Sequence, residues 1–162
     1  MIRIAVSACL LGNKVRYDGG HKQHELLGIL YKTTGVEFVG FCPEAILGVP
    51  RSPIHLTLSP SGDMDVARVD NGQSVSRKLR SSIDDVLADL QSSNIRGVIC
   101  KSRSPSCALR DADYNTPGKE GPGLLIQAIR KAFPQVPIID ENDVDDPDKL
   151  REFLNLLSMD QK

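Results

Sequence analysis

Short apolar segments recur along the chain, separated by longer stretches with other patterns of apolar and polar residues. The short segments are rich in β-branched residues and almost continuously apolar, as expected of strands that are buried on both faces. They are IRIAVS (2–7), VEFVGF (36–41), GVICK (97–101) and VPIID (136–140). This pattern predicts a sheet of about four strands.

Between and after these segments, apolar residues recur at the spacing of one face of a helix. The clearest series is Leu79, Ile83, Val86, Leu87 and Leu90. Further helices are expected over 21–31, over 125–133 with Pro134 at the end, and over 148–157 after Asp146-Pro147. Because strands and helices alternate, the sequence predicts an α/β fold with a mostly parallel sheet flanked by helices.

Two segments interrupt this alternation. Residues 54–69, IHLTLSPSGDMDVARV, predict a small β-hairpin that turns at 59–63. Residues 114–123, YNTPGKEGPG, are rich in Gly and Pro and predict a loop that serves as a lid over the site. We expect residues 1–162 to form one domain, because a chain of this length can bury a single core.

Composition narrows the class of protein. Apolar residues make up 40% of the chain and charged residues 25%, which is ordinary for a globular domain. The net charge of −1 gives no basic patch for nucleic acid, and no apolar run approaches the length of a membrane span. The N-terminal residues lack the pattern of a signal peptide, so we expect a cytoplasmic protein whose cysteines are reduced.

The cysteines fall at informative places. The chain has four, Cys9, Cys42, Cys100 and Cys107, and none forms a Cys-x-x-Cys pair. Cys9, Cys42 and Cys107 each follow the end of a predicted strand. The carboxyl ends of parallel strands share one edge of a sheet, where ligands bind, so we expect these thiols to converge. Cys100 lies within a strand and is expected to be a buried core residue.

Two of the cysteines have a proline close by. Pro43 follows Cys42 directly, and Pro105 follows Ser104 in the sequence RSPSC. Proline is favoured at the first position of a helix, so both segments predict sharp strand-to-helix turns, with Gly48 ending the first. Free N–H groups at such turns favour a thiolate over a thiol, which is the form that binds a metal.

Spacing leaves the kind of metal open. A structural zinc site needs a fourth ligand, which His55 or Cys100 could supply. A catalytic zinc site would keep an open position, and a [4Fe–4S] cluster bound by three cysteines would leave one iron free for substrate. A further alternative is a zinc-binding or redox-sensing module without catalysis.

Several polar residues lie near these cysteines. Glu44 follows Cys42 closely and is a candidate acid or base, although a carboxylate early in a helix is often only a complement to the dipole. Ser104 and Ser106 can act as caps, with Ser104 the natural N-cap before Pro105. Lys101 and Arg103 flank the same loop and can offset the charge of thiolates.

Substrate contacts are expected from loops at the same edge of the sheet. The segment VRYDGGH (15–21) follows the first strand and supplies Arg16 and Tyr17, and Glu141 follows the fourth strand. Together with the neighbours of the last cysteine, these give the candidate substrate-binding residues Arg16, Tyr17, Lys101, Arg103, Ser106 and Glu141.

Three segments, VSACLLGNKVRYDGG, FCPEAILGVPRSP and KSRSPSC, occur in the order and at about the spacing seen in one family. On them the chain resembles the bacterial thiouracil desulfurase family, and the resemblance covers nearly the whole sequence. It implies a [4Fe–4S] cluster bound by Cys9, Cys42 and Cys107.

The resemblance also implies a reaction and two catalytic residues. The family's catalytic glutamate falls on Glu44, and its catalytic serine falls on Ser104. The reaction is a non-redox desulfuration of a thiolated pyrimidine base, in which iron acts as a Lewis acid on the thiocarbonyl and water attacks the ring carbon. The implied partner is therefore a small-molecule thiolated base.

Overall fold

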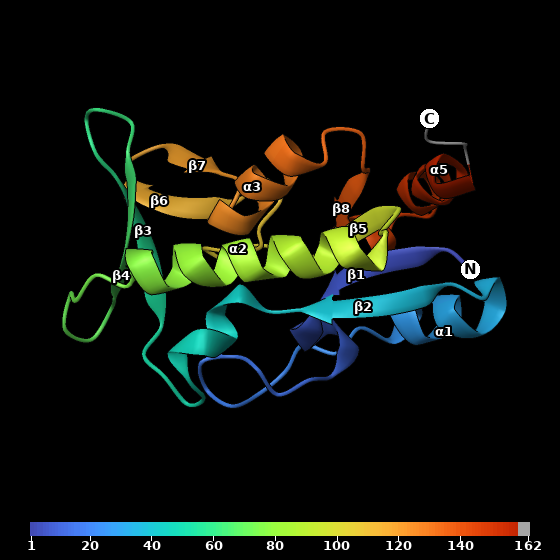
Figure 1. Ribbon diagram of the computed structural model, residues 1–162, viewed down its shortest axis with the longest axis horizontal. Coiled ribbons are helices and arrows are strands. Elements are labelled where there is room, and N and C mark those ends of the chain that lie inside the picture. The colour runs from blue at the N-terminus through green and yellow to red at the C-terminus, as the bar shows by residue number, and fades with distance from the viewer. Residues whose placement is uncertain (159–162) are drawn as a thin grey trace.

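The computed structural model describes residues 1–158, apart from the side chains of residues 33 and 34, and its centre is a parallel sheet. Four strands form the sheet in the order β2-β1-β5-β8. Their bounds are β1 (Arg3–Ser7), β2 (Glu37–Phe41), β5 (Gly97–Cys100) and β8 (Ile138–Asp140). Ala5 of β1 pairs in register with Val39 on one side and Val98 on the other. The predicted α/β fold is confirmed (Figure 1).

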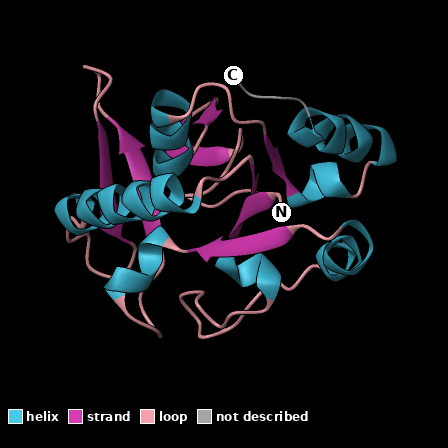
Figure 2. Ribbon diagram, turned by 45° about the vertical axis from the view of Figure 1, so that its right-hand side comes forward, coloured by secondary structure: helices cyan, strands magenta, loops and turns pink. Residues whose placement is uncertain are grey.

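Alternate residues of the central strands face opposite cores. Ala5, Val98 and Cys100 pack into a cluster with residues of α2 (Ser76–Ser93) and α3 (Leu124–Ala132). Ile4, Val6 and Ile99 pack with residues of α1 (Glu25–Thr34) and α5 (Pro147–Ser158). Because both faces are covered, the central strands are almost continuously apolar, which is why they stand out in the sequence (Figure 2).

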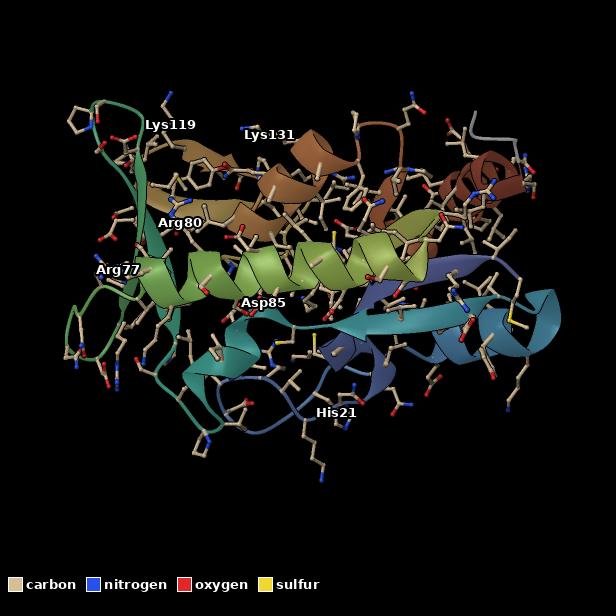
Figure 3. The ribbon with its side chains drawn as sticks, viewed as in Figure 1. His21, Arg77, Arg80, Asp85, Lys119 and Lys131 are labelled. Carbon is tan, nitrogen blue, oxygen red and sulfur yellow. The ribbon has the colours of Figure 1, made fainter. Side chains whose placement is uncertain are left out.

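The long helices lie close to where the sequence predicted them. The apolar face of α2 buries Leu79, Ile83 and Leu90. Figure 3 shows Arg77, Arg80 and Asp85 along α2, and all three are exposed. The first helix begins at Glu25 rather than His21, because Lys22 and His24 donate backbone hydrogen bonds to Cys9 and Leu10 instead of starting a helix.

Short helices follow three of the strands. They are the 3-10 helices η1 (Ala8–Leu11) and η2 (Pro43–Leu47), and α4 (Glu141–Val144). Pro43 occupies the first turn of η2 and Gly48 ends it, as predicted. Neither η1 nor α4 was predicted, because segments of this length carry too few residues for a helical period.

Two hairpins lie beyond the sheet. Residues 54–69 form the predicted hairpin from β3 (Ile54–Leu58) and β4 (Met64–Arg68). The prediction of a loop over 114–123 is wrong, because β6 (Ala112–Thr116) and β7 (Lys119–Gly121) form a second hairpin there. It lies beside the first hairpin, where Asn115 Nδ2 donates a 2.6 Å hydrogen bond to the carbonyl of Leu56.

The strand order determines where a ligand can bind. The chain passes from β1 outward to β2, then crosses to the other side of β1 to form β5. In sheets of this kind, the crevice outside the carboxyl ends at such a reversal is the usual binding site. No helix within residues 1–158 is both long and apolar enough to cross a membrane.

Candidate active site

A cavity of about 440 Å³ opens at the carboxyl ends of β1, β2 and β5. Its wall includes three of the cysteines and most of the candidate residues named from the sequence. Those lining it are Cys9, Cys42, Cys107, Glu44, Ser104, Arg16, Tyr17, Lys101 and Arg103. The convergence expected from the topology is therefore present, although the segment 114–123 contributes nothing to this wall and does not form a lid.

Each cysteine of the wall is placed by the segment that follows a strand. Cys9 lies in η1 directly after β1, and Cys42 is the residue before η2, directly after β2. Cys107 ends the turn that follows β5 and is buried. Cys100 is fully buried in the core, as predicted, and its thiol lies 3.5 Å from the carbonyl of Ile139.

The expected bias toward thiolates is wrong for the protein without metal. Burial raises the pKa of Cys9 to about 11, with a further increase from the neighbouring Cys42. Burial also raises the pKa of Cys107 to about 12 and, together with Glu44, raises that of Cys42. The backbone N–H groups of Glu44 and Ala45 do lower the pKa of Cys42, but burial outweighs them.

The turn around Pro105 is tighter than predicted. Residues 105–107 form a single turn that does not continue as a helix. Ser104 Oγ accepts hydrogen bonds from the N–H groups of Ser106 and Cys107, at 3.3 and 3.0 Å, and its carbonyl accepts from the N–H of Ala108. Ser104 thus caps this turn while its side chain also lies on the cavity wall.

Glu44 is joined to both serines of the turn. Its Oε2 accepts a 2.5 Å hydrogen bond from Ser106 Oγ and a longer one, 3.4 Å, from Ser104 Oγ. Ser106 is fully buried, and its hydroxyl also lies 3.5 Å from the sulfur of Cys107. A carboxylate, two hydroxyls and a thiol from the segments after β2 and β5 therefore form one connected group.

Arg51 is a further residue of the wall, and no sequence motif marks it as functional. Its Nη1 donates a 2.8 Å hydrogen bond to the carbonyl of Gly48, and its Nη2 lies 3.7 Å from Glu44 Oε1. Its side chain is 7% exposed, and its Nε is buried without a hydrogen-bond partner among the described residues. The available signal was a charged residue between Pro50 and Pro53 in a segment of the family resemblance.

The basic candidates differ in their surroundings. Lys101 Nζ lies 3.1 Å from Glu141 Oε1, so its charge is already paired. The charge of Lys101 lowers the pKa of Cys9, in the direction expected, and the charge of Arg16 also lowers it, but burial raises this pKa by more. Arg103 is exposed, and its backbone is in the left-handed region with a φ of 62°. Tyr17 lines the cavity and is 39% exposed.

Two candidate substrate contacts, Ser106 and Glu141, do not line the cavity. Each instead bonds a residue that does: Ser106 bonds Glu44, and Glu141 bonds Lys101 and Ser102. Burial raises the pKa of Glu141, but the hydrogen bonds from Ser102 and the charge of Lys101 outweigh it and lower the pKa overall. Glu141 is therefore a carboxylate at neutral pH.

The three cysteines of the wall are a donor set that suits an iron–sulfur cluster, because such clusters are held by cysteine thiolates. Among residues 1–158, no group of three or more His, Cys, Asp and Glu side chains is arranged around one metal position. The proposed fourth zinc ligands, His55 and Cys100, do not line the cavity. In a [4Fe–4S] cluster each cysteine binds a different iron, so the cluster takes several thiolates from different segments, and this wall offers three.

Comparison of the sequence with models of known families agrees with the fold and the cavity described above. Residues 4–141 match the model of the 2-thiouracil desulfurase family, and the chain belongs to this family. This confirms the resemblance seen in the three sequence segments.

Two relatives span almost the whole chain. The "Uncharacterized protein YbbK" of Bacillus subtilis (strain 168) is 28% identical over 152 residues, covering 88% of this chain and 98% of that protein. A solved structure described as the [4Fe-4S]-dependent thiouracil desulfidase TudS is 28% identical, with a TM-score of 0.72. That alignment covers 98% of this chain and 99% of the other.

Proposed function

We propose that this protein is a [4Fe–4S]-dependent, non-redox desulfurase that converts a thiolated pyrimidine such as thiouracil into uracil and sulfide. The observation that carries the proposal is the placement of Cys9, Cys42 and Cys107 on one cavity wall with Glu44 and Ser104. Water supplies the oxygen of the new carbonyl, and the sulfur leaves as sulfide, so no external oxidant or reductant is required.

Cys9, Cys42 and Cys107 are the residues that would bind the cluster. When bound, the cluster supplies a Lewis-acidic iron that attracts the sulfur of the thiocarbonyl. Burial raises the pKa values of these thiols, so they would lose their protons in order to hold the cluster as thiolates. The positive charge of a bound cluster would offset the negative charge of these buried thiolates.

Glu44 acts as the general base of the proposed reaction. Its carboxylate lies on the cavity wall, where it can take a proton from the water that attacks the carbon bearing the sulfur. Ser104 keeps its hydroxyl oriented by accepting from two backbone N–H groups, and it donates toward Glu44. Ser104 therefore orients the Glu44 carboxylate and presents a hydroxyl to the thiolated pyrimidine.

The proposal is tested on protein purified without oxygen. Iron and sulfide analysis and an absorption spectrum report the cluster, and uracil and sulfide are measured during turnover of thiouracil. We expect Glu44→Gln and Ser104→Ala to lower kcat by about 10²- to 10⁴-fold while the iron content stays at the wild-type value. Stoichiometric zinc without iron would overturn the proposed cofactor. A protein that carries the cluster but does not act on thiouracil would overturn the proposed substrate.

A further inference from the structure

The loop of residues 101–111 carries Ser104 and Cys107 but has no helix or strand of its own. It connects β5 to β6, and Arg103 within it has a left-handed backbone. A site that acts on a bound base requires its groups to be placed within a fraction of an ångström. Contacts from outside the loop must therefore supply the rigidity that secondary structure does not.

Glu141 contacts the start of the loop. Its Oε2 accepts a 2.8 Å hydrogen bond from the backbone N–H of Ser102, and its carboxylate also accepts from the Ser102 hydroxyl. Lys101 Nζ donates to Glu141 Oε1 at 3.1 Å. The side chain of Glu141 is only 12% exposed, so these bonds are largely shielded from water.

Asp143 contacts the end of the loop. Arg110 donates to its two oxygens at 3.3 and 2.9 Å, in a bidentate arrangement that fixes direction as well as distance. Asp143 is itself held in place, because its Oδ2 accepts from the N–H of Asp140 while Asp140 Oδ1 accepts from the N–H of Asp143. This reciprocal capping fixes α4 relative to β8.

We propose that residues 140–143 form a clamp that positions the 101–111 loop. Glu141 and Asp143 project from one short segment onto the two ends of the loop, and the turn with Ser104 and Cys107 lies between those ends. They are positioning residues: they act through the loop and do not line the cavity. The roles given to Ser104 and Cys107 rest on the proposed function, whereas the clamp is a property of the metal-free chain as well.

The first test measures how fast each cysteine of the full chain is alkylated, resolved by mass spectrometry. Cys107 is 6% exposed, and we expect Glu141→Ala and Arg110→Ala to increase its labelling rate by about tenfold or more. Labelling of Cys42, which follows a different strand, should not change. Arg110→Lys should restore slow labelling, and Glu141→Gln, which retains an acceptor oxygen, should give an intermediate rate.

Lys149→Ala is the matched control, because Lys149 pairs with the same Asp143 oxygen at 3.4 Å but forms no hydrogen bond or ion pair with the loop. Unchanged Cys107 labelling in Glu141→Ala and Arg110→Ala would overturn the clamp. Equal acceleration in Lys149→Ala would also overturn it, since that would reflect general loosening around Asp143.

The second test uses the protein carrying iron. We expect Glu141→Ala and Arg110→Ala to lower the iron content or alter the absorption and EPR spectra, while Lys149→Ala matches wild type. Wild-type iron content and spectra in both Glu141→Ala and Arg110→Ala would overturn the clamp. If no form of the protein acts on thiouracil but Cys107 labelling responds as expected, the proposed function fails and the clamp stands.

Discussion

Ser106 Oγ donates a 2.5 Å hydrogen bond to Glu44 Oε2, which joins the turn after β5 to the turn after β2 behind the cavity wall. Ser106 is fully buried, so water does not compete for this bond. The same hydroxyl lies 3.5 Å from the sulfur of Cys107. One serine therefore connects the proposed general base to a proposed cluster ligand.

We expect Ser106→Ala to lower kcat by about 10- to 100-fold with little change in KM, because a hydrogen bond to a charged group contributes about 1.5–3 kcal/mol. Steady-state turnover of thiouracil by iron-loaded protein checks this. Ser82→Ala is the matched control: Ser82 Oγ donates a 2.7 Å hydrogen bond to the Pro43 carbonyl, on the same turn, and is not hydrogen-bonded to Glu44. An equal loss in both variants would show that Ser106 only stabilises the turn.

A second prediction concerns Arg51, which lies near Oε1, the other carboxylate oxygen of Glu44. Arg51→Ala removes the 2.8 Å bond to the Gly48 carbonyl and leaves Glu44 Oε1 without its cation, so we expect a loss of about 2 kcal/mol in unfolding free energy and reduced turnover. Arg51→Lys keeps the charge and should recover part of both. Urea unfolding and thiouracil turnover are the measurements. Arg77→Ala, at an exposed arginine of α2, should change neither by much.

The sequence predicted the main sheet and the convergence of the cysteines for a physical reason. Strands covered on both faces must be continuously apolar, and parallel strands place their carboxyl ends at one edge. Once four such segments were recognised, Cys9, Cys42 and Cys107 were expected at the same edge without knowledge of any distance. Cys100 was expected in the core for the same reason.

Other features depend on contacts that a sequence pattern does not express. The β6–β7 hairpin is formed by polar, Gly-containing residues, and its Asn115 bonds a carbonyl of the other hairpin. The direction of the cysteine pKa shifts was wrong because it depends on the depth of burial, which the local turn chemistry does not reveal. Arg51 contacts Gly48 and Glu44 only in the folded chain. It lies outside any helical or strand pattern of apolar residues, so the sequence gives no sign of these contacts.

Gly123 allows a test of how closely α3 packs on the turn that carries Cys107. A Cβ atom at this position would lie 2.5 Å from the Ser106 carbonyl carbon and 2.9 Å from the Cys107 nitrogen, which are backbone atoms. We expect Gly123→Ala to destabilise the chain by about 1–3 kcal/mol and to lower its iron content, because the turn must shift. Thermal unfolding and iron analysis check this.

Gly28→Ala is the control for that substitution. Gly28 lies within α1, and a Cβ atom there would meet nothing within 4 Å. Alanine is favoured over glycine inside a helix, so this variant should be more stable by about 0.5–1 kcal/mol and keep its iron. Wild-type iron content in Gly123→Ala would show that the turn tolerates displacement.

Glu141 gives a prediction for the dependence of stability on pH. Burial raises its pKa, but the Ser102 hydrogen bonds and the charge of Lys101 lower it by more, so the folded value lies below the unfolded one of about 4.3. A carboxylate whose pKa is lower in the folded than in the unfolded state stabilises the fold at pH values above the unfolded pKa. This contribution is lost as the pH falls through the folded pKa. We expect Glu141→Gln to cost about 1–3 kcal/mol at pH 7, and the difference from wild type to shrink below about pH 4.

Urea unfolding of both proteins between pH 7 and pH 3 measures this difference. Asp148→Asn is the reference, because Asp148 pairs with Arg151 on the surface, where the two side chains are 89% and 70% exposed. Its effect should stay below about 0.5 kcal/mol across the range. A Glu141→Gln difference that stays constant from pH 7 to pH 3 would mean that the carboxylate charge is not what stabilises the start of the 101–111 loop, and that the loss of one acceptor oxygen facing Ser102 accounts for the difference.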